Sequence, residues 1–251
     1  MTDSNFWDYL KEGFLSLIYP ISCQNCGRPI KESHGYSICG DCLKLIKLIP
    51  MPYCYQCGKP FSPEVDFEKG ALCADCRHKE RHFYFTRSVA YYQGVLRECI
   101  HLLKYQKQVK LVQPLGKLMI NYLSANDLIK IKEIGLITPV PLFEDDCLKR
   151  GFNQSGLLAK YIADYFSIKY TENLLIKYKR NLSQVGLSKA ERKNNVKNVY
   201  AINPDFQLNG ISSILLLDDI FTTGATIEAI CLELKKTGIS KLYVLTLARG
   251  V

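Results

Sequence analysis

The sequence predicts an α/β protein: a parallel sheet covered by helices, preceded by a small cysteine-rich module. Two observations support this. Beyond residue 81, short apolar segments alternate with helical patterns, which is typical of a parallel sheet that is buried on both faces. Before residue 77, eight of the eleven cysteines lie in four CxxC pairs. At 251 residues the chain is long enough for one such domain and a small satellite.

The chain divides into three expected parts: an amphipathic segment (1–22), a cysteine module (23–80) and an α/β domain (81–251). Residues 6–19 place apolar side chains on one helical face, which we expect to pack against the module; a membrane surface is the alternative. No apolar run approaches the roughly 20 residues that span a bilayer, and acids stand where a signal peptide is positively charged. We expect a cytoplasmic protein, and a peripheral position at the inner membrane stays open.

The cysteine module is expected to bind two structural zinc ions. In a reducing compartment clustered cysteines are more often metal ligands than disulfides, and two CxxC pairs complete a tetrahedral four-thiolate site. The first and third pairs precede a glycine and the second and fourth do not, so that one unit is written twice. Sequential pairing is the simplest arrangement and a cross-braced one stays open; an iron–sulfur cluster and a redox dithiol are less favoured. The expected ligands are Cys23, Cys26, Cys39, Cys42, Cys54, Cys57, Cys73 and Cys76.

Apolar patterns in the rest of the chain predict the order of strands and helices. In chain order these are a strand over SVAYY (88–92), helices over 95–107 and 111–123, a strand over 136–142, a polar loop ending in RGFNQ (150–154), a helix over 155–166, a basic loop over 180–199, a strand over 211–219, a helix over 227–236 and a strand over 242–248.

The most informative segment is ILLLDDIFTTGATI, residues 214–227. A buried strand carries Asp218 and Asp219 to its carboxyl end, where open α/β sheets bind ligands. The small residues that follow turn into a helix, so that backbone N–H groups, hydroxyls and the helix dipole form an anion cradle. Paired carboxylates beside it suit the two hydroxyls of a ribose, so the pattern predicts a holder for ribose 5-phosphate. The turn consists of Thr222, Thr223, Gly224, Ala225 and Thr226.

This segment resembles the phosphoribosyl pyrophosphate motif of type I phosphoribosyltransferases. PVPLFEDDCLKRGFNQS, RNLSQVGLSKAERKNNVKNVY and the terminal LAR, behind a double zinc ribbon, resemble the ComF family over nearly the whole chain. The resemblance implies a type I phosphoribosyltransferase fold, with Asp218 and Asp219 on the ribose hydroxyls and residues 222–226 on the 5-phosphate. It also implies Mg²⁺ on the pyrophosphate and pyrophosphate contacts from Arg150 and Gly151. A flexible catalytic loop is implied for residues 180–198, with the basic residues Arg180, Lys189, Arg192 and Lys193.

One residue departs from part of that wider family. Purine-salvage phosphoribosyltransferases carry an aspartate, which acts as a base toward the nucleobase, where this chain has Thr222. Other branches also have threonine there, so the departure does not exclude catalysis. It removes one argument for purine chemistry.

Charge and resemblance together suggest the function. Residues 81–251 carry 24 basic against 14 acidic side chains, and residues 177–197 alone carry a net charge of +6, which favours phosphate ligands. ComF members act on incoming single-stranded DNA in natural transformation, often beside a helicase, which implies single-stranded DNA and a competence helicase as partners. Tyr91, Tyr92 and Tyr105 offer rings for base stacking, although packing explains each alone.

Two other functions stay open. One is an active phosphoribosyltransferase in which Asp218 and Asp219 serve catalysis toward an unidentified acceptor. The other is a sensor of phosphoribosyl pyrophosphate that changes its grip on DNA. Both use the same predicted phosphate site.

Overall fold

The computed structural model describes residues 22–30, 37–62, 70–125, 129–179 and 199–250. Two expectations fall outside these ranges. One is the amphipathic helical face over residues 6–19. The other is the basic loop, with Arg180, Lys189, Arg192 and Lys193.

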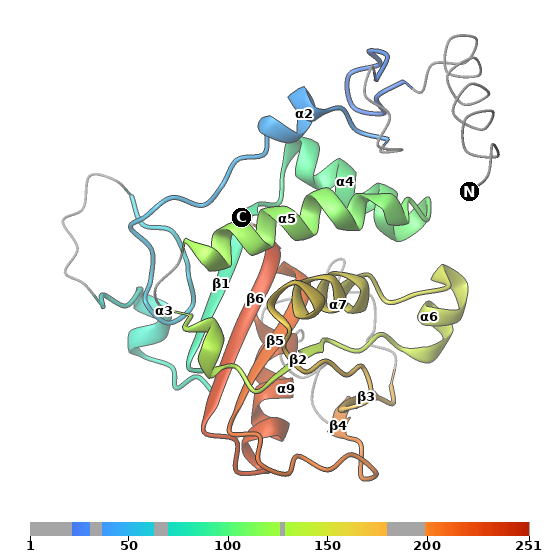
Figure 1. The fold of residues 1–251 in the computed structure, drawn as a ribbon. Helices are drawn as coiled ribbons and strands as arrows, with labels where there is room; N and C mark the ends of the chain where they lie inside the picture. Colours follow the sequence, from blue (N-terminus) through green and yellow to red (C-terminus); the bar gives the residue numbers. More distant parts are fainter. Residues whose placement is uncertain (1–21, 31–36, 63–69, 126–128, 180–198, 251) are drawn as a thin grey trace.

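The centre of the fold is a four-stranded parallel sheet in the order β1-β6-β5-β2 (Figure 1). All three strand pairs are parallel, which confirms the expected α/β class. A separate antiparallel pair, β3 with β4, was not expected, because three-residue strands carry too little pattern to detect. The strands are β1 (Phe85–Tyr91), β2 (Leu136–Pro139), β3 (Leu175–Lys177), β4 (Tyr200–Ile202), β5 (Ser213–Phe221) and β6 (Lys241–Arg249).

Helices cover both faces of this sheet (Figure 1). The helices α4 (Gly94–Tyr105), α5 (Val112–Ser124) and α7 (Gln154–Phe166) pack on one face, and α9 (Ala225–Lys235) packs on the other. The short elements are α2 (Gly40–Lys44), α3 (Ala74–Arg77), α6 (Glu144–Arg150) and the 3₁₀ turns η1 (Val109–Leu111) and η2 (Ile131–Glu133). Among the described residues, none of the helices is long and apolar enough to cross a bilayer.

The helix α6 corrects one expectation, since residues 144–150 were expected to form a polar loop. Its sequence, EDDCLKR, is mostly charged and has no apolar period that could signal a helix. In agreement with this, none of its residues is buried. Three acids lie in its first turn and two bases in its last, a distribution that complements the helix dipole. Charge placement stabilises this helix where burial does not.

Strand β5 builds both cores, because its alternate side chains point to opposite faces. Leu215 and Leu217 join the core beneath α4, α5 and α7. Ile214 and Leu216 join the core beneath α9. All four side chains are fully buried, which explains the continuous apolar run that predicted this strand.

The two cysteine units pack against opposite cores. Cys23 and Cys42 lie against the α4–α5 side, and the four cysteines from Cys54 to Cys76 lie against the α9 side. The chain between them runs along β1, where Ile49 N–H donates to Val89 O (3.0 Å) and Tyr91 N–H donates to Lys47 O (2.9 Å). This segment covers the outer edge of the sheet, which would otherwise present unpaired backbone groups.

The second unit contacts β1 closely enough to give a matched test. Gly27 and Gly58 occupy the same turn in the two units, with φ of 70° and 66°. A Cβ at Gly58 would lie 2.7 Å from the Thr86 carbonyl oxygen, whereas one at Gly27 would meet nothing within 4 Å. Gly58→Ala should therefore cost at least about 1 kcal/mol of unfolding free energy more than Gly27→Ala, which loses only the left-handed backbone preference. Urea unfolding of both variants measures the two changes in unfolding free energy. Equal changes would show that the second unit does not pack closely against β1 at Gly58.

Candidate functional site

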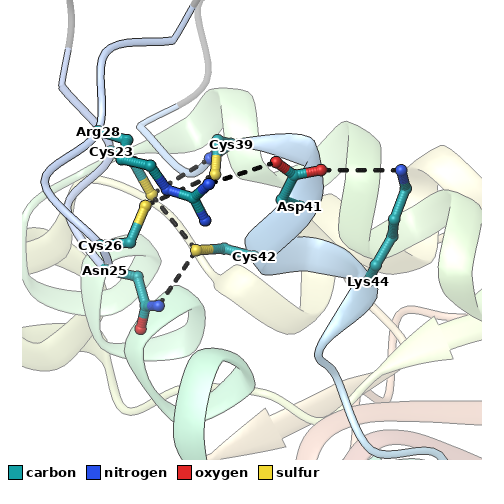
Figure 2. A network of polar contacts seen from close by, with 8 residues as sticks. All are labelled: Cys23, Asn25, Cys26, Arg28, Cys39, Asp41, Cys42 and Lys44. Carbon is teal, nitrogen blue, oxygen red and sulfur yellow. Dashed lines mark hydrogen bonds and ion pairs between the residues drawn. The ribbon is translucent and has the colours of Figure 1, made fainter.

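The structure gathers the eight predicted cysteines into two clusters of four. Within each cluster the sulfur atoms lie within 4.8 Å of one another, and the clusters follow sequence order, Cys23 to Cys42 and Cys54 to Cys76. The sequential arrangement is therefore the one adopted. Figure 2 shows the first cluster, in which Cys23, Cys26, Cys39 and Cys42 converge from a turn and the start of α2.

The two clusters share one backbone scaffold. In the first, Gly27 N–H donates to Cys23 O (2.8 Å) and Cys39 N–H donates to the Cys23 sulfur (3.3 Å). In the second, Gly58 N–H donates to Cys54 O (2.9 Å) and Cys73 N–H donates to the Cys54 sulfur (3.3 Å). The third cysteine of each unit precedes a short helix. The expected repeat of a turn pair and a helix-entry pair is confirmed.

Sulfur spacing in both clusters fits zinc. The Cys23–Cys42, Cys26–Cys39 and Cys57–Cys73 sulfur pairs are 3.7, 3.8 and 3.7 Å apart. Four sulfurs at the usual zinc–sulfur distance of about 2.3 Å form a tetrahedron with edges of roughly 3.8 Å. With four thiolates each, the clusters offer closed sites, as structural zinc requires.

The acidities of the thiols also indicate that a cation is needed. Burial raises the pKa of Cys42 to about 12 and that of Cys76 to about 11. The hydrogen bond from the Cys57 thiol, helped by backbone N–H groups, lowers the pKa of Cys54 to about 4. Without a cation the four thiols of a cluster therefore do not ionise together, because each thiolate disfavours the next. A bound divalent cation would remove that repulsion.

The predicted acidic pair lies at the carboxyl end of β5. Asp218 accepts from the Ser155 hydroxyl on α7 (3.0 Å) and from the Asp219 N–H (2.9 Å). Asp219 forms an ion pair with Lys104, near the end of α4. Asp219 is buried and Asp218 is partly so, so both carboxylates are held in fixed positions by α4 and α7.

Asp218 is poised near neutral pH. Burial, together with the charge of Asp219, raises its pKa to about 7, and Lys104 and the hydrogen-bond donors oppose this rise. A carboxyl group with such a pKa exchanges a proton under physiological conditions, which is common at functional sites.

The small-residue turn leads directly into α9, as predicted. Gly224 is the N-cap of α9 with φ of 76°, and a Cβ there would lie 2.6 Å from the Phe221 ring. Only glycine fits this position, since both the backbone angle and the neighbouring ring exclude a side chain. Thr222 and Thr223 are exposed, so that their hydroxyls are open to a ligand.

The RGFNQ segment runs from the last residue of α6 to the first residue of α7. Gly151 ends α6, and Arg150 donates to Gln154 Oε1 (2.9 Å) while its guanidinium stands 5.4 Å from the centre of the Tyr105 ring. Asn153 caps α7 and donates to Val140 O (3.0 Å). A Cβ on Gly151 would lie 3.9 Å from Lys107 Nζ. The end of α4 therefore lies close both to this segment and to the acidic pair.

Lys104 and Ser155 were not among the residues predicted from the sequence. Lys104 stands in an otherwise apolar helical run, LLKY, and this apolar context is the signal that could have pointed to a buried lysine. Ser155 follows RGFNQ directly, and nothing in the sequence tells that its hydroxyl turns toward β5. Both depend on helix packing, which the sequence does not display.

Comparisons with known proteins agree with this architecture. Residues 14–78 match the double zinc ribbon domain family. The chain is 29% identical to competence protein F of Haemophilus influenzae, over 85% of this chain and 90% of the relative. It is 27% identical to the DNA utilization protein YhgH of Salmonella typhimurium, over 93% and 99%. It is 26% identical to competence protein ComFC of Streptococcus pneumoniae, over 91% and 100%.

The resemblance to the ComF family is confirmed. Similarity to relatives named competence protein or DNA utilization protein extends over most of the chain, well beyond the ribbons. The two four-cysteine clusters are the ribbon sites of this architecture, and their donor set is consistent with structural zinc.

We predict that the purified protein holds two zinc ions and that Cys57→Ser holds one. Loss of one thiolate from the second cluster should empty that cluster and spare the first, because the clusters share no ligand. Metal analysis by inductively coupled plasma mass spectrometry gives the ratio. Cys231→Ser, outside both clusters, is the matched control and should keep both ions. Loss of both ions from Cys57→Ser, with the control intact, would contradict independent sites.

A second prediction concerns pH. Because the Asp218 pKa is raised in the folded protein, folding binds a proton between about pH 4 and pH 7, and stability falls as pH rises through that window. Asp218→Asn keeps the hydrogen-bond acceptor and removes the charge. It should raise the unfolding free energy at pH 8 by about 1–3 kcal/mol and change it little at pH 4. The exposed Asp164→Asn, which alters a surface pair with Lys160, should show no such pH dependence. Denaturant unfolding at both pH values decides.

Proposed function

We propose that this protein binds phosphoribosyl pyrophosphate and single-stranded DNA during DNA uptake in natural transformation. The observation that carries the proposal is the meeting of Asp218, Asp219 and the Gly224 turn at the carboxyl edge of the sheet. Relatives that are similar over most of the chain are named competence protein and DNA utilization protein, and these names support the DNA role. In this proposal residues 81–251 form a type I phosphoribosyltransferase-like domain.

The sugar phosphate would be held by residues that already stand in place. Asp218 and Asp219 would accept from the ribose hydroxyls, and the turn from Thr222 to Thr226 would bind the 5-phosphate at the start of α9. The cation of Arg150 and the backbone at Gly151 would face the pyrophosphate. Mg²⁺ would come with the pyrophosphate and neutralise part of its charge.

In the absence of ligand, Lys104 neutralises the charge of Asp219 and keeps the net charge of the site low. Its ammonium group pairs with Asp219, and both side chains are largely buried. Ribose hydroxyls that donate to Asp219 would share or replace that contact, which leaves Lys104 able to contact a phosphate oxygen. Lys104 would thus exchange its contact with Asp219 for one with the phosphate, so that neither buried charge is left without a partner of opposite charge.

Single-stranded DNA would be bound by the basic segment from Lys177 onward. Lys177, in β3, lies 5.7 Å from the centre of the Tyr200 ring, and Lys179 is exposed beyond it. If about six of the segment's cations met phosphates, affinity would fall with log salt at a slope of about −4. A competence helicase and the inner face of the membrane would be its surroundings in this role.

One observation favours a second function, transfer of ribose 5-phosphate to an acceptor. The Asp218 carboxyl has a pKa of about 7, the range in which a carboxyl can accept or give a proton during turnover. Asp218 and Asp219 would then act in catalysis, and the acceptor remains to be found by assay.

A single titration separates these functions. Fluorescence anisotropy of labelled single-stranded DNA, with and without phosphoribosyl pyrophosphate and Mg²⁺, is followed together with pyrophosphate release. We expect DNA binding that weakens with salt, and ligand binding that Asp219→Ala reduces at least about tenfold by removing a charged hydrogen-bond acceptor. Asp164→Asn is the control. Salt-independent DNA affinity would contradict the DNA role; turnover without DNA binding would establish the enzyme.

A further inference from the structure

A second recess adjoins the turn after β5, on the side of the second zinc ribbon. It encloses a cavity of about 850 Å³, within the size range of small-molecule sites. Thr222 and Thr223 form one wall, and residues of the ribbon around Cys57 and α3 form the other. We call this cavity the ribbon pocket. Neither the acidic pair nor Lys104 lines it.

The ribbon pocket is strongly basic. Lys59, Lys79, Arg81 and Arg249 line it together with His78, and Asp75 is the one acid in its lining. These cations come from separate parts of the chain, the ribbon on one side and the end of β6 on the other. In a concave site their fields add, so the pocket attracts anions more strongly than the same charges would on a flat surface.

Arg81 places a buried guanidinium in the lining of the ribbon pocket, and not all of its donors are hydrogen-bonded. Its side chain is only 8% exposed, and its nearest acid, Glu228, lies at 3.8 Å. Glu228 Oε1 accepts from the backbone N–H (3.1 Å) and the imidazole of His82, whereas Oε2, which faces Arg81, has no hydrogen-bond partner among the described residues, so Arg81 and Glu228 form an ion pair without a hydrogen bond. Among the described residues, Arg81 Nε and Nη1 have no hydrogen-bond acceptor. A buried guanidinium with open donors costs free energy unless an anion completes it.

Arg249 is held rigidly at the opposite wall. Its Nη1 donates to Cys57 O (2.8 Å), and its guanidinium lies 4.6 Å from the centre of the Phe221 ring. Gly250 N–H donates to Phe221 O (2.8 Å), which fixes the end of β6 against the turn. The pocket is therefore formed in advance by the docking of the ribbon on the sheet.

The lining points to a particular ligand class. Guanidinium groups bind phosphate through two parallel hydrogen bonds, and several cations around one cavity suit a ligand with more than one negative charge. Tyr91, which is partly exposed, adds an aromatic ring to the same lining, and aromatic rings stack on nucleobases. The combination of cations, threonine hydroxyls and an aromatic ring fits a nucleoside phosphate.

We propose that the ribbon pocket binds a nucleoside phosphate, either a free mononucleotide or one nucleotide unit of a single DNA strand. This rests on the proposed function, because the pocket shares Thr222 and Thr223 with the predicted 5-phosphate turn. The second ribbon then contributes directly to ligand binding, and an occupant of the pocket touches the turn from a cavity that the acidic pair does not line.

The test compares three variants of the full chain. Lys59→Gln/Lys79→Gln removes two exposed pocket charges, Arg81→Gln removes the buried cation, and Lys44→Gln/Lys236→Gln removes two exposed charges that do not line the pocket. Calorimetry with deoxyadenosine monophosphate and anisotropy with a labelled oligothymidylate of about 15 nucleotides measure binding between roughly 50 and 200 mM salt. Hexaglutamate serves as the competing acidic peptide.

We expect Arg81→Gln to weaken nucleotide or strand binding about tenfold or more, by loss of charged hydrogen bonds. The Lys59/Lys79 double variant should make the salt slope for the strand shallower by about 1.4, and the Lys44/Lys236 control should change affinity less than about twofold. Binding of the mononucleotide identifies a free nucleotide as ligand, and binding of the strand alone identifies DNA.

Three results would overturn the inference in distinguishable ways. If the wild type binds the strand and both pocket variants match the control, the ribbon pocket is wrong and the DNA role stands. If the wild type binds neither strand nor mononucleotide, the DNA role fails with it. Displacement of the bound nucleotide by equimolar hexaglutamate would mean that the pocket takes acidic peptides instead.

Discussion

The sheet is buried on both faces, and this burial decides where charge can lie. Leu215 and Leu217 face one core and Ile214 and Leu216 the other, so a charged side chain in the middle of β5 would have no solvent and no partner. On β5 and β6 the charged side chains therefore lie near the strand ends. In the edge strand β1 the buried Arg87 is instead held by the Thr86 carbonyl and the Tyr53 ring. Asp218 and Asp219 on β5 and Arg249 on β6 lie at the same carboxyl edge, and both candidate sites are built there.

The ribbons extend this edge. A module of this size has little core of its own, so bound metal and contact with the sheet must both contribute to its stability. The second ribbon lies along β1, where Thr86 N–H donates to Gln56 O (2.7 Å), and Arg249 binds its Cys57 carbonyl. These contacts place Lys59 and Arg81 opposite the Gly224 turn. A metal site that is structural in its chemistry thereby shapes a surface for ligands.

Features written in contiguous residues could be predicted from the sequence. The CxxC pairs and the strand–turn–helix around Asp218 are local, and both appear where expected, although β5 runs to Phe221 and includes the two acids rather than ending at them. The structure alone displays what depends on packing between distant segments. The Lys104–Asp219 pair spans more than a hundred residues, and α6 has no apolar face to announce it. The ribbon pocket joins five separate stretches of the chain, so no single motif could predict it.

A site for a sugar phosphate must offer acceptors to the ribose hydroxyls without repelling the phosphate groups, and the electrostatics of the acidic pair meet both requirements. Two ionised carboxylates suit ribose hydroxyls but would repel a pyrophosphate beside them. Here Lys104 neutralises Asp219, and the raised pKa of Asp218 leaves that group partly protonated near neutral pH. The site thus keeps its hydrogen-bond acceptors while its net negative charge stays small. With Arg150 and Lys107 beside Gly151 on the neighbouring segment, the surrounding field favours an anion, although two acids stand at its centre.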